Sequence, residues 1–96
     1  MEAVLARHPA VAECAVIAAP DEVRGEVIEA YVVTTTDSAV TQDELQQWVK
    51  DHYAAHAYPR RIHFVPSLPK TPSGKIQRAE LRRRRRAEVL DEEGPR

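Results

Sequence analysis

A short stretch near the C-terminal end, KTPSGKIQR (residues 70–78), places a lysine directly after a Ser-Gly pair. Gly74-Lys75 matches the end of the pattern G-x-x-x-x-G-K-[ST], in which a glycine-rich turn binds phosphates and a hydroxyl binds magnesium. Ile76 stands where that hydroxyl is required, and Pro69 stands where the first glycine is required. The spacing therefore excludes a P-loop and leaves Lys75 as a cation in a polar, proline-marked loop.

Three other side chains have reactive chemistry, and none of them forms a recognisable site. His52 and His56 have the i,i+4 spacing that puts two imidazoles on one helix face. Tyr53, however, occupies the place of the glutamate in H-E-x-x-H, and no third ligand is evident. Cys14 and Val16 lie on the same face of an apolar stretch predicted to be a strand. We therefore expect Cys14 to be a small buried hydrophobic residue rather than a nucleophile. We therefore expect no metal site in this chain.

The net charge of −1 conceals three segments of different sign. Residues 1–59 carry 3 basic and 10 acidic side chains (−7), residues 60–86 carry 10 and 1 (+9), and residues 87–96 carry 1 and 4 (−3). An anion would bind the basic segment, which contains Lys75. The run from Arg82 to Arg86 would point in all directions on a helix, and no aromatic residue interleaves it for base stacking. We expect this run to be solvated or docked on an acidic neighbour, and a small anion-binding or nucleic-acid-binding module stays open as a second hypothesis.

The length and composition of the chain indicate one small domain without an apolar run of membrane-spanning length. Ninety-six residues fit one small domain, which buries only about two-thirds of its unfolded surface, so a deep enclosed active site is not expected. The chain is 43% hydrophobic and 30% charged, with no apolar run near the roughly 20 residues that span a membrane. No signal peptide is recognised at residues 1–4, and a single cysteine fits a reducing compartment. We expect a cytoplasmic protein.

The elements predicted around the loop are those of a small α+β domain. A short helix is predicted over residues 2–8, followed by strands over residues 12–18 and 27–35 that form a hairpin through a turn ending at Gly25. In the second strand, we expect Ile28, Ala30 and Val32 to face inward and Glu29 to lie on the other face.

The rest of the chain is predicted to add two helices and a third strand. Thr41 to Glu44 is a capping box that begins a helix running to about His56, with Leu45, Trp48, Val49 and His52 along one buried stripe. Lys50 lies off this stripe and is expected to project toward solvent. Residues 61–65 are predicted to form a strand. A helix is predicted from Arg78, with a Glu80–Arg84 pair and a frayed acidic tail over residues 87–96. The expected fold is α+β, three strands packed against the Trp48 helix in one domain over residues 1–86.

Two segments of the sequence resemble a known family. HPAVAECAVIAAPDEVRGEVIEAYVV (residues 8–33) and AYPRRIHFVPSLPKTPSGKIQRAELR (residues 57–82) are similar to the C-terminal domain of adenylate-forming acyl-CoA synthetases, most of all the short/medium-chain acyl-CoA and benzoate-CoA ligases. The resemblance covers about residues 2–83. It implies that an acid attacks ATP to give an acyl-adenylate and pyrophosphate, after which the domain swings on a hinge and a CoA thiol displaces AMP.

The resemblance also implies roles for particular residues. Lys75 would be the catalytic lysine of adenylation, and Ser73-Gly74 would keep its loop small and extended enough to enter a cleft of another domain. Such an ammonium supplies a point charge where negative charge develops. The Tyr58-Pro59-Arg60 segment is shared with medium-chain synthetases, and by this likeness Arg24, Lys50 and Tyr58 would bind CoA.

The remaining expectations concern partners and the rest of the enzyme. The family's hinge and its large ATP- and acid-binding N-terminal domain would precede Glu2, so the chain alone is expected to be inactive. That domain would select the acid, and the full-length enzyme would need Mg²⁺, for which we find no ligand in this segment. The arginine run would dock on that domain, and a lysine acetyltransferase would silence Lys75 by neutralising its charge. A peptide-synthetase-type domain that loads a carrier protein is the near alternative.

Overall fold

A long antiparallel hairpin forms the centre of the fold. The computed structural model describes residues 1–21, 23–36 and 38–93. Its elements in order are α1 (Glu2–Ala6), β1 (Val11–Asp21), β2 (Gly25–Thr34), α2 (Gln42–His52), β3 (Arg61–Phe64) and α3 (Arg78–Glu93). The predicted hairpin and the positive φ of Gly25 (+79°) are confirmed, and both strands are longer than expected.

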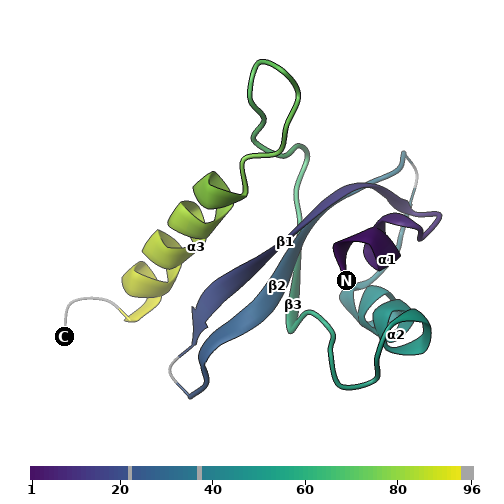
Figure 1. Ribbon diagram of the computed structural model, residues 1–96, viewed down its shortest axis with the longest axis horizontal. Helices are drawn as coiled ribbons and strands as arrows, with labels where there is room; N and C mark the ends of the chain where they lie inside the picture. The colour runs from purple at the N-terminus through teal and green to yellow at the C-terminus, as the bar shows by residue number, and fades with distance from the viewer. Residues whose placement is uncertain (22, 37, 94–96) are drawn as a thin grey trace.

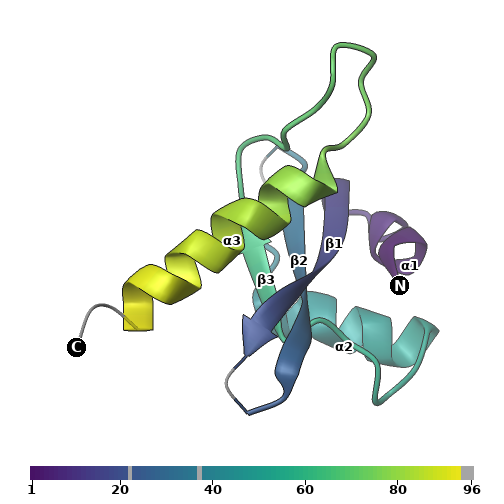
Figure 2. The same cartoon turned by 60° about the vertical axis from the view of Figure 1, so that its left-hand side comes forward.

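The sheet has three strands in the order β1-β2-β3, with β3 parallel to β2. Figures 1 and 2 show α1 and α2 on one face of the sheet and α3 on the other. The predicted α+β class is therefore confirmed. Packing against the Trp48 helix alone was too simple, because α3 covers the second face and makes three layers.

Two apolar clusters lie on the two sides of the sheet. Strand residues alternate between faces, so neighbouring residues in β1 and β2 enter different clusters. The cluster beneath α1 and α2 contains Leu5, Val11, Cys14, Ala30, Val32, Leu45, Val49 and Ile62. The cluster beneath α3 contains Ala15, Ile17, Tyr31, Leu68 and Leu81.

Two expectations for β2 were wrong. Ile28, expected to be inside, is 39% exposed and lies near the turn end of the hairpin, three residues from Gly25. Glu29, whose face we did not expect to be covered, is buried because α3 packs on that face. The burial of Glu29 was missed because the position of α3 was not visible in the strand pattern.

Helix α2 begins as predicted and ends earlier. The Thr41 hydroxyl accepts a hydrogen bond from the Glu44 backbone N–H (3.2 Å), as an N-cap should. The helix ends at His52 rather than at His56, because the chain turns back to reach β3. The Gln46 side chain donates to the Pro59 carbonyl (2.9 Å) and holds this returning segment. His52 is exposed and not part of a buried stripe; it stacks on the half-buried Trp48 ring at 3.9 Å.

Helix α3 extends further than predicted. It is helical through Glu93, where a frayed tail from residue 87 was expected, and the last three residues of that tail lie outside the described residues. The predicted Glu80–Arg84 pair is confirmed at 2.9 Å. Within the described part of the chain, no helix has both the length and the apolar character that a membrane span requires.

Candidate active-site lysine and nucleotide-binding surface

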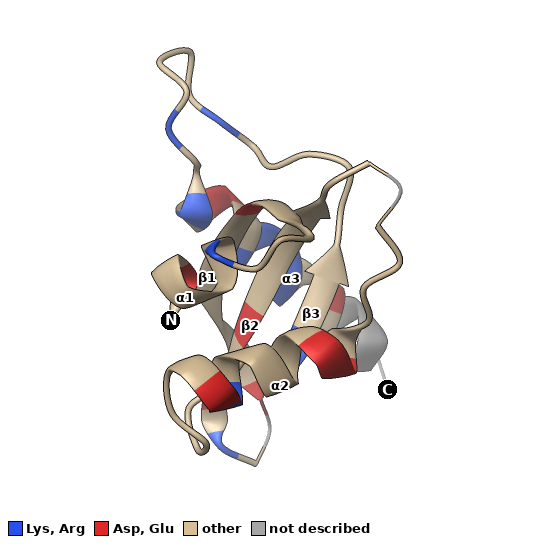
Figure 3. Cartoon of the chain, turned by 90° about the vertical axis from the view of Figure 1, so that its right-hand side faces the viewer, with Lys and Arg blue, Asp and Glu red and all other residues tan. Residues whose placement is uncertain are grey.

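The loop that carries Lys75, which we call the Lys75 loop (residues 70–76), is a closed hairpin. Lys70 and Ile76 form an antiparallel bridge at its base. Inside it, Thr71 N donates to the Lys75 carbonyl (2.8 Å), and Gly74 N donates to the Thr71 carbonyl (2.8 Å). Figure 1 shows it projecting beyond the sheet and helices, and Figure 3 shows basic residues on it.

The tip of this loop is a tight turn. Gly74 has a φ of +87°, a conformation that side-chain-bearing residues rarely adopt, so glycine is required there for the turn. The Thr71 hydroxyl accepts from the Lys75 backbone N–H (3.1 Å) and lies 3.0 Å from the Ser73 hydroxyl. Ser73 and Gly74 thus fix where the Lys75 side chain begins.

The Lys75 side chain itself is exposed. Among the described residues, its ammonium group has neither a hydrogen-bond partner nor an ion-pair partner. The lysine borders an open hollow of about 550 Å³ between the loop and the start of α3, which Gln77, Arg78 and Glu80 also line. A cation in this position is available to an anion from outside the domain.

A second basic surface surrounds Tyr58. The Nζ atom of Lys50 lies 4.2 Å from the centroid of the Tyr58 ring, and the guanidinium carbon of Arg60 lies 4.5 Å from it. Arg60 also donates a hydrogen bond to the Tyr58 hydroxyl. Lys50 is therefore half-buried over the ring instead of projecting freely toward solvent.

Arg24 joins the same surface from the β1–β2 hairpin. Its backbone N–H donates to the Asp21 carboxylate (2.9 Å), and its side chain is exposed. Arg24 and Arg60 line two adjoining open hollows of about 380 and 250 Å³, and Tyr58 lines the smaller one. The structure thus brings the predicted residues Arg24, Lys50 and Tyr58 together. The Lys75 loop projects at the end of the sheet opposite to the β1–β2 turn (Figure 1).

Arg60 is the residue of this surface that sequence reasoning passed over. It stands in the Tyr58-Pro59-Arg60 segment that the sequence analysis had already singled out. The signal was its position two residues after Tyr58, since residues i and i+2 of an extended segment lie on one side.

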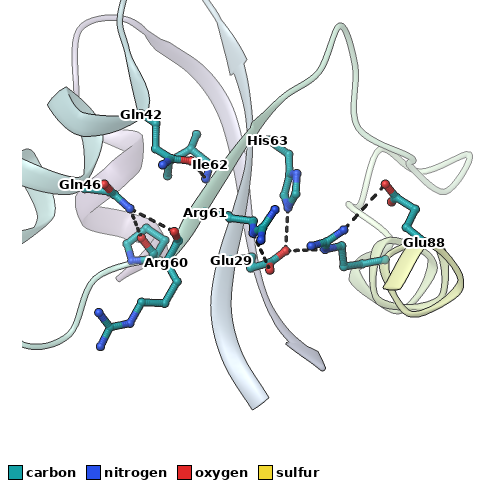
Figure 4. Close-up of polar contacts among 10 residues, drawn as sticks. Glu29, Gln42, Gln46, Arg60, Arg61, Ile62, His63 and Glu88 are labelled. Carbon is teal, nitrogen blue, oxygen red and sulfur yellow. Dashed lines mark hydrogen bonds and ion pairs between the residues drawn. The ribbon is translucent and has the colours of Figure 1, made fainter. Parts of the chain in front are cut away.

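A third group of charges is buried between the sheet and α3 (Figure 4). The Glu29 carboxylate accepts from Arg85 Nε at 2.8 Å and contacts His63 Nε2 at 2.6 Å, with Arg61 Nε 3.9 Å away. Beside it, the Tyr31 ring stacks on His63 at 4.6 Å, and burial raises the pKa of the Tyr31 hydroxyl. The expectation that the arginine run would dock on a separate domain was wrong for Arg85, whose partner is in this chain.

The other arginines of the run face outward. Arg83 and Arg84 both bond to Glu80, and the pKa of Glu80 is lowered to about 2 by its hydrogen bonds from Arg83 and then Arg84. Because these arginines share one carboxylate and Arg85 is buried, the run does not form a continuous basic face. It therefore gives little support to the nucleic-acid hypothesis.

The remaining reactive side chains do not assemble into a site. Burial raises the pKa of Cys14 to about 11, as expected of a buried thiol and opposite to what a nucleophile requires. His56 lies beyond the end of α2, so it does not share a helix face with His52. Over the residues whose placement is described, no group of three or more His, Cys, Asp or Glu side chains could hold a metal ion.

Comparison with known proteins identifies the family. The family described as AMP-binding enzyme C-terminal domain matches residues 1–75, ending at the lysine of the loop. The chain belongs to this family. The resemblance seen in the sequence is therefore confirmed.

Individual relatives agree with this assignment. The domain is 53% identical over 87 residues to the human mitochondrial acyl-coenzyme A synthetase ACSM2A, covering 85% of this chain and 15% of the relative. The crystal structure of an acyl-CoA synthetase from Brucella canis matches with a TM-score of 0.87 at 46% identity, over 93% of this chain and 17% of that chain. The amide bond synthetase McbA of Marinactinospora thermotolerans matches with a TM-score of 0.79 at 38% identity, over 85% and 17%. The chain thus spans about one-sixth of the length of these relatives.

Proposed function

We propose that this domain contributes to the active site of an ATP-dependent acid–thiol ligase. In the first step, a carboxylate oxygen attacks the α-phosphorus of ATP and pyrophosphate leaves, giving an acyl-adenylate. In the second step, the thiol of CoA attacks the acyl carbon, AMP leaves, and the thiol proton is released. Family membership and the names of the similar proteins support this proposal.

The observation that carries the proposal is the state of Lys75. Adenylation brings together a carboxylate and a polyanionic nucleotide, so the reaction requires a cation where negative charge develops. Lys75 is exposed, it projects on a closed loop, and its ammonium has no acidic partner among the described residues. A lysine whose ammonium has no acidic partner within its own domain is suited to bind an anion in a cleft formed by another domain.

The Tyr58 surface is proposed to bind the nucleotide part of CoA. Arg24 and Arg60 flank one hollow and can donate charge-assisted hydrogen bonds to phosphate oxygens. Lys50 adds a third cation beside them. The Tyr58 ring already has the cations of Lys50 and Arg60 over it. We therefore propose that Tyr58 mainly holds these two side chains in place for the nucleotide.

The partner in this proposal is an N-terminal adenylating domain, which would supply the pocket for the acid. The relatives, of which this chain spans about one-sixth, support such a partner. Mg²⁺ would be held by ATP and that domain. A buried free cysteine is compatible with a reducing compartment, and we propose the cytoplasm.

The acceptor of the second step is the least constrained part of the proposal. The related McbA is named an amide bond synthetase, so a similar domain accompanies a different acceptor. The basic surface around Tyr58 favours CoA, since its nucleotide carries several phosphate charges. A carrier protein or an amine is the alternative.

The proposal is tested in the full-length protein that contains this chain. With a panel of carboxylic acids, we expect acid-dependent exchange of labelled pyrophosphate into ATP, followed by thioester formation when CoA is added. Deleting residues 1–96 should abolish both. Exchange without thioester formation, combined with transfer to a carrier protein or an amine, would replace CoA as the acceptor, and an absence of exchange with every acid would contradict the ligase function.

Lys75 is also proposed as a target of a lysine acetyltransferase. Acetylation would remove its charge while the exposed loop remains accessible to the modifying enzyme. We expect acetylated full-length protein to lose pyrophosphate exchange. An unchanged exchange rate at complete acetylation would exclude this form of regulation.

A further inference from the structure

The legs of the Lys75 loop carry two more cations. Lys70 begins the loop, and Arg78 follows it as the first residue of α3. Three positive charges thus lie within nine residues. The positions of these three side chains determine which of them an incoming anion contacts. The structure pairs the outer two with carboxylates from the N-terminal third of the chain.

The first leg is held by β1. Lys70 Nζ forms an ion pair with the Glu13 carboxylate, and the two side chains are 38% and 35% exposed. Glu13 is part of the β1–β2 ladder, opposite Val33, so its backbone is fixed by the sheet. This pair ties the start of the loop to the edge strand.

The second leg is held by α1. Arg78 donates to Glu2 through Nε (3.1 Å) and through Nη2, a two-point contact that fixes the angle between the groups. Glu2 Oε2 also accepts the backbone N–H of Val16 (2.8 Å), which places the carboxylate against β1. The hydrogen bond from Arg78 lowers the pKa of Glu2, and the bond to Glu2 raises the pKa of Arg78, so both groups stay charged at neutral pH.

The apolar contacts of the loop leave its direction open. Leu68 is buried and Ile76 packs partly against the same cluster, which holds the base of the loop against the sheet. Neither residue controls rotation of the hairpin about its two legs, because hydrophobic contact is not directional. Two ion pairs on opposite legs, one to β1 and one to α1, supply that control.

We propose that Glu13 and Glu2 are positioning residues for Lys75. Their ion pairs with Lys70 and Arg78 set the direction of the Lys75 loop, and they neutralise the flanking cations so that Lys75 is the charge presented to the substrate anions. This inference rests on the proposed adenylating role of Lys75. A displacement of a reacting group by about 1 Å can lower the rate by up to roughly a hundredfold. Two ion pairs that fix the direction of the Lys75 loop would therefore affect the rate of adenylation.

The test uses charge exchange in the full-length protein. Glu13→Lys places two cations together, and we expect the kcat of adenylation to fall by roughly tenfold with the KM for ATP unchanged. The double variant Glu13→Lys/Lys70→Glu restores an ion pair of reversed polarity and should recover the wild-type kcat. Glu13→Gln and Glu2→Gln, which change little in shape, should each lower kcat without affecting thioester formation from supplied acyl-adenylate. Asp51→Asn on the exposed side of α2 is the matched control and should leave both steps unchanged.

Lys75→Ala, assayed in parallel, distinguishes a failure of the proposed adenylating role of Lys75 from a failure of the positioning role of Glu2 and Glu13. If Lys75→Ala does not slow adenylation, the proposed function of Lys75 is wrong and the positioning role falls with it. If Lys75→Ala slows adenylation and the Glu13 variants match the wild type, only the positioning role is overturned. Equal loss of both half-reactions in Glu13→Lys and in the double variant would indicate general damage to the fold and would also overturn it.

Discussion

Arg85 and Lys75 show two opposite uses of a cation in one small domain. The Arg85 side chain is 5% exposed and lies 2.8 Å from the buried carboxylate of Glu29, whereas Lys75 is exposed on a projecting loop. Charge buried in the fold is neutralised within the chain, and the charge proposed for catalysis is left without a partner among the described residues. The difference separates residues that hold α3 on the sheet from residues that are available to a ligand.

The two settings have different energetics. Moving a charge pair out of water costs several kcal/mol per ion, and a buried pair recovers this only with good geometry and full hydrogen bonding. In the Glu29 cluster, Arg85 and His63 both contact one carboxylate oxygen of Glu29, and Arg61 lies 3.9 Å from the other. An exposed cation keeps its hydration and costs the fold little, so Lys75, Arg24 and Arg60 are free to serve binding.

Removing the buried carboxylate should give the largest effect on stability. Glu29→Ala removes the buried carboxylate that Arg85, His63 and Arg61 contact, and we expect a loss of about 3–5 kcal/mol in the free energy of unfolding, measured by urea denaturation. The double variant Glu29→Met/Arg85→Met removes both charges and should recover most of that loss. A single-variant loss below about 1 kcal/mol would show that the buried cluster does not hold α3 in the way described.

Removing an exposed arginine should affect binding and spare the fold. Arg60→Ala should raise the KM for CoA by roughly tenfold, the value of about one charge-assisted hydrogen bond, while the free energy of unfolding changes by less than about 0.5 kcal/mol. Arg7→Ala, another exposed arginine, is the control and should change neither quantity. A large loss of stability in Arg60→Ala would erase the distinction between the two settings.

The Glu2–Arg78 pair is intermediate between the two settings, and pH tests it with the smallest expected effect. Because the hydrogen bond from Arg78 holds the folded-state pKa of Glu2 below its ordinary value of 4.5, the stabilising contribution of Glu2 is present above that value and is lost as pH falls through the lowered pKa. Glu2→Gln should therefore be less stable than the wild type at pH 7, by less than about 1 kcal/mol. The difference should shrink below pH 4. Parallel acid-denaturation curves for the two proteins would contradict this account of the pair.

Much of the fold could be predicted from local patterns in the sequence. Alternation places Cys14 and Ala15 on different faces of β1, and the capping box at Thr41 begins α2 where expected. The docking of α3 could not be predicted, because its arginine run has no apolar periodicity and its anchor Arg85 meets Glu29, 56 residues earlier. The end of α2 was misplaced for a similar reason, since Gln46 fixes a returning segment 13 residues away.

The candidate site divides in the same way. Lys75 was found because a contiguous motif surrounds it, and Arg24, Lys50 and Tyr58 were found through family resemblance. Glu2 and Glu13 were not found, because nothing local distinguishes them from the other acidic residues and their partners lie 76 and 57 residues away. Contacts between distant segments are decided by the tertiary fold, which residue patterns do not encode directly.

The role of Lys75 is tested most directly by measuring the two half-reactions of full-length Lys75→Ala side by side. We predict that acid-dependent pyrophosphate exchange falls by roughly 10²–10³-fold, since a cation that stabilises developing charge is lost. Thioester formation from supplied acyl-adenylate should continue at close to the wild-type rate, because the Lys75 loop and the β1–β2 turn that carries Arg24 lie at opposite ends of the sheet (Figure 1). Unchanged pyrophosphate exchange, or an equal loss in both half-reactions, would contradict the assignment of Lys75 as the adenylation lysine.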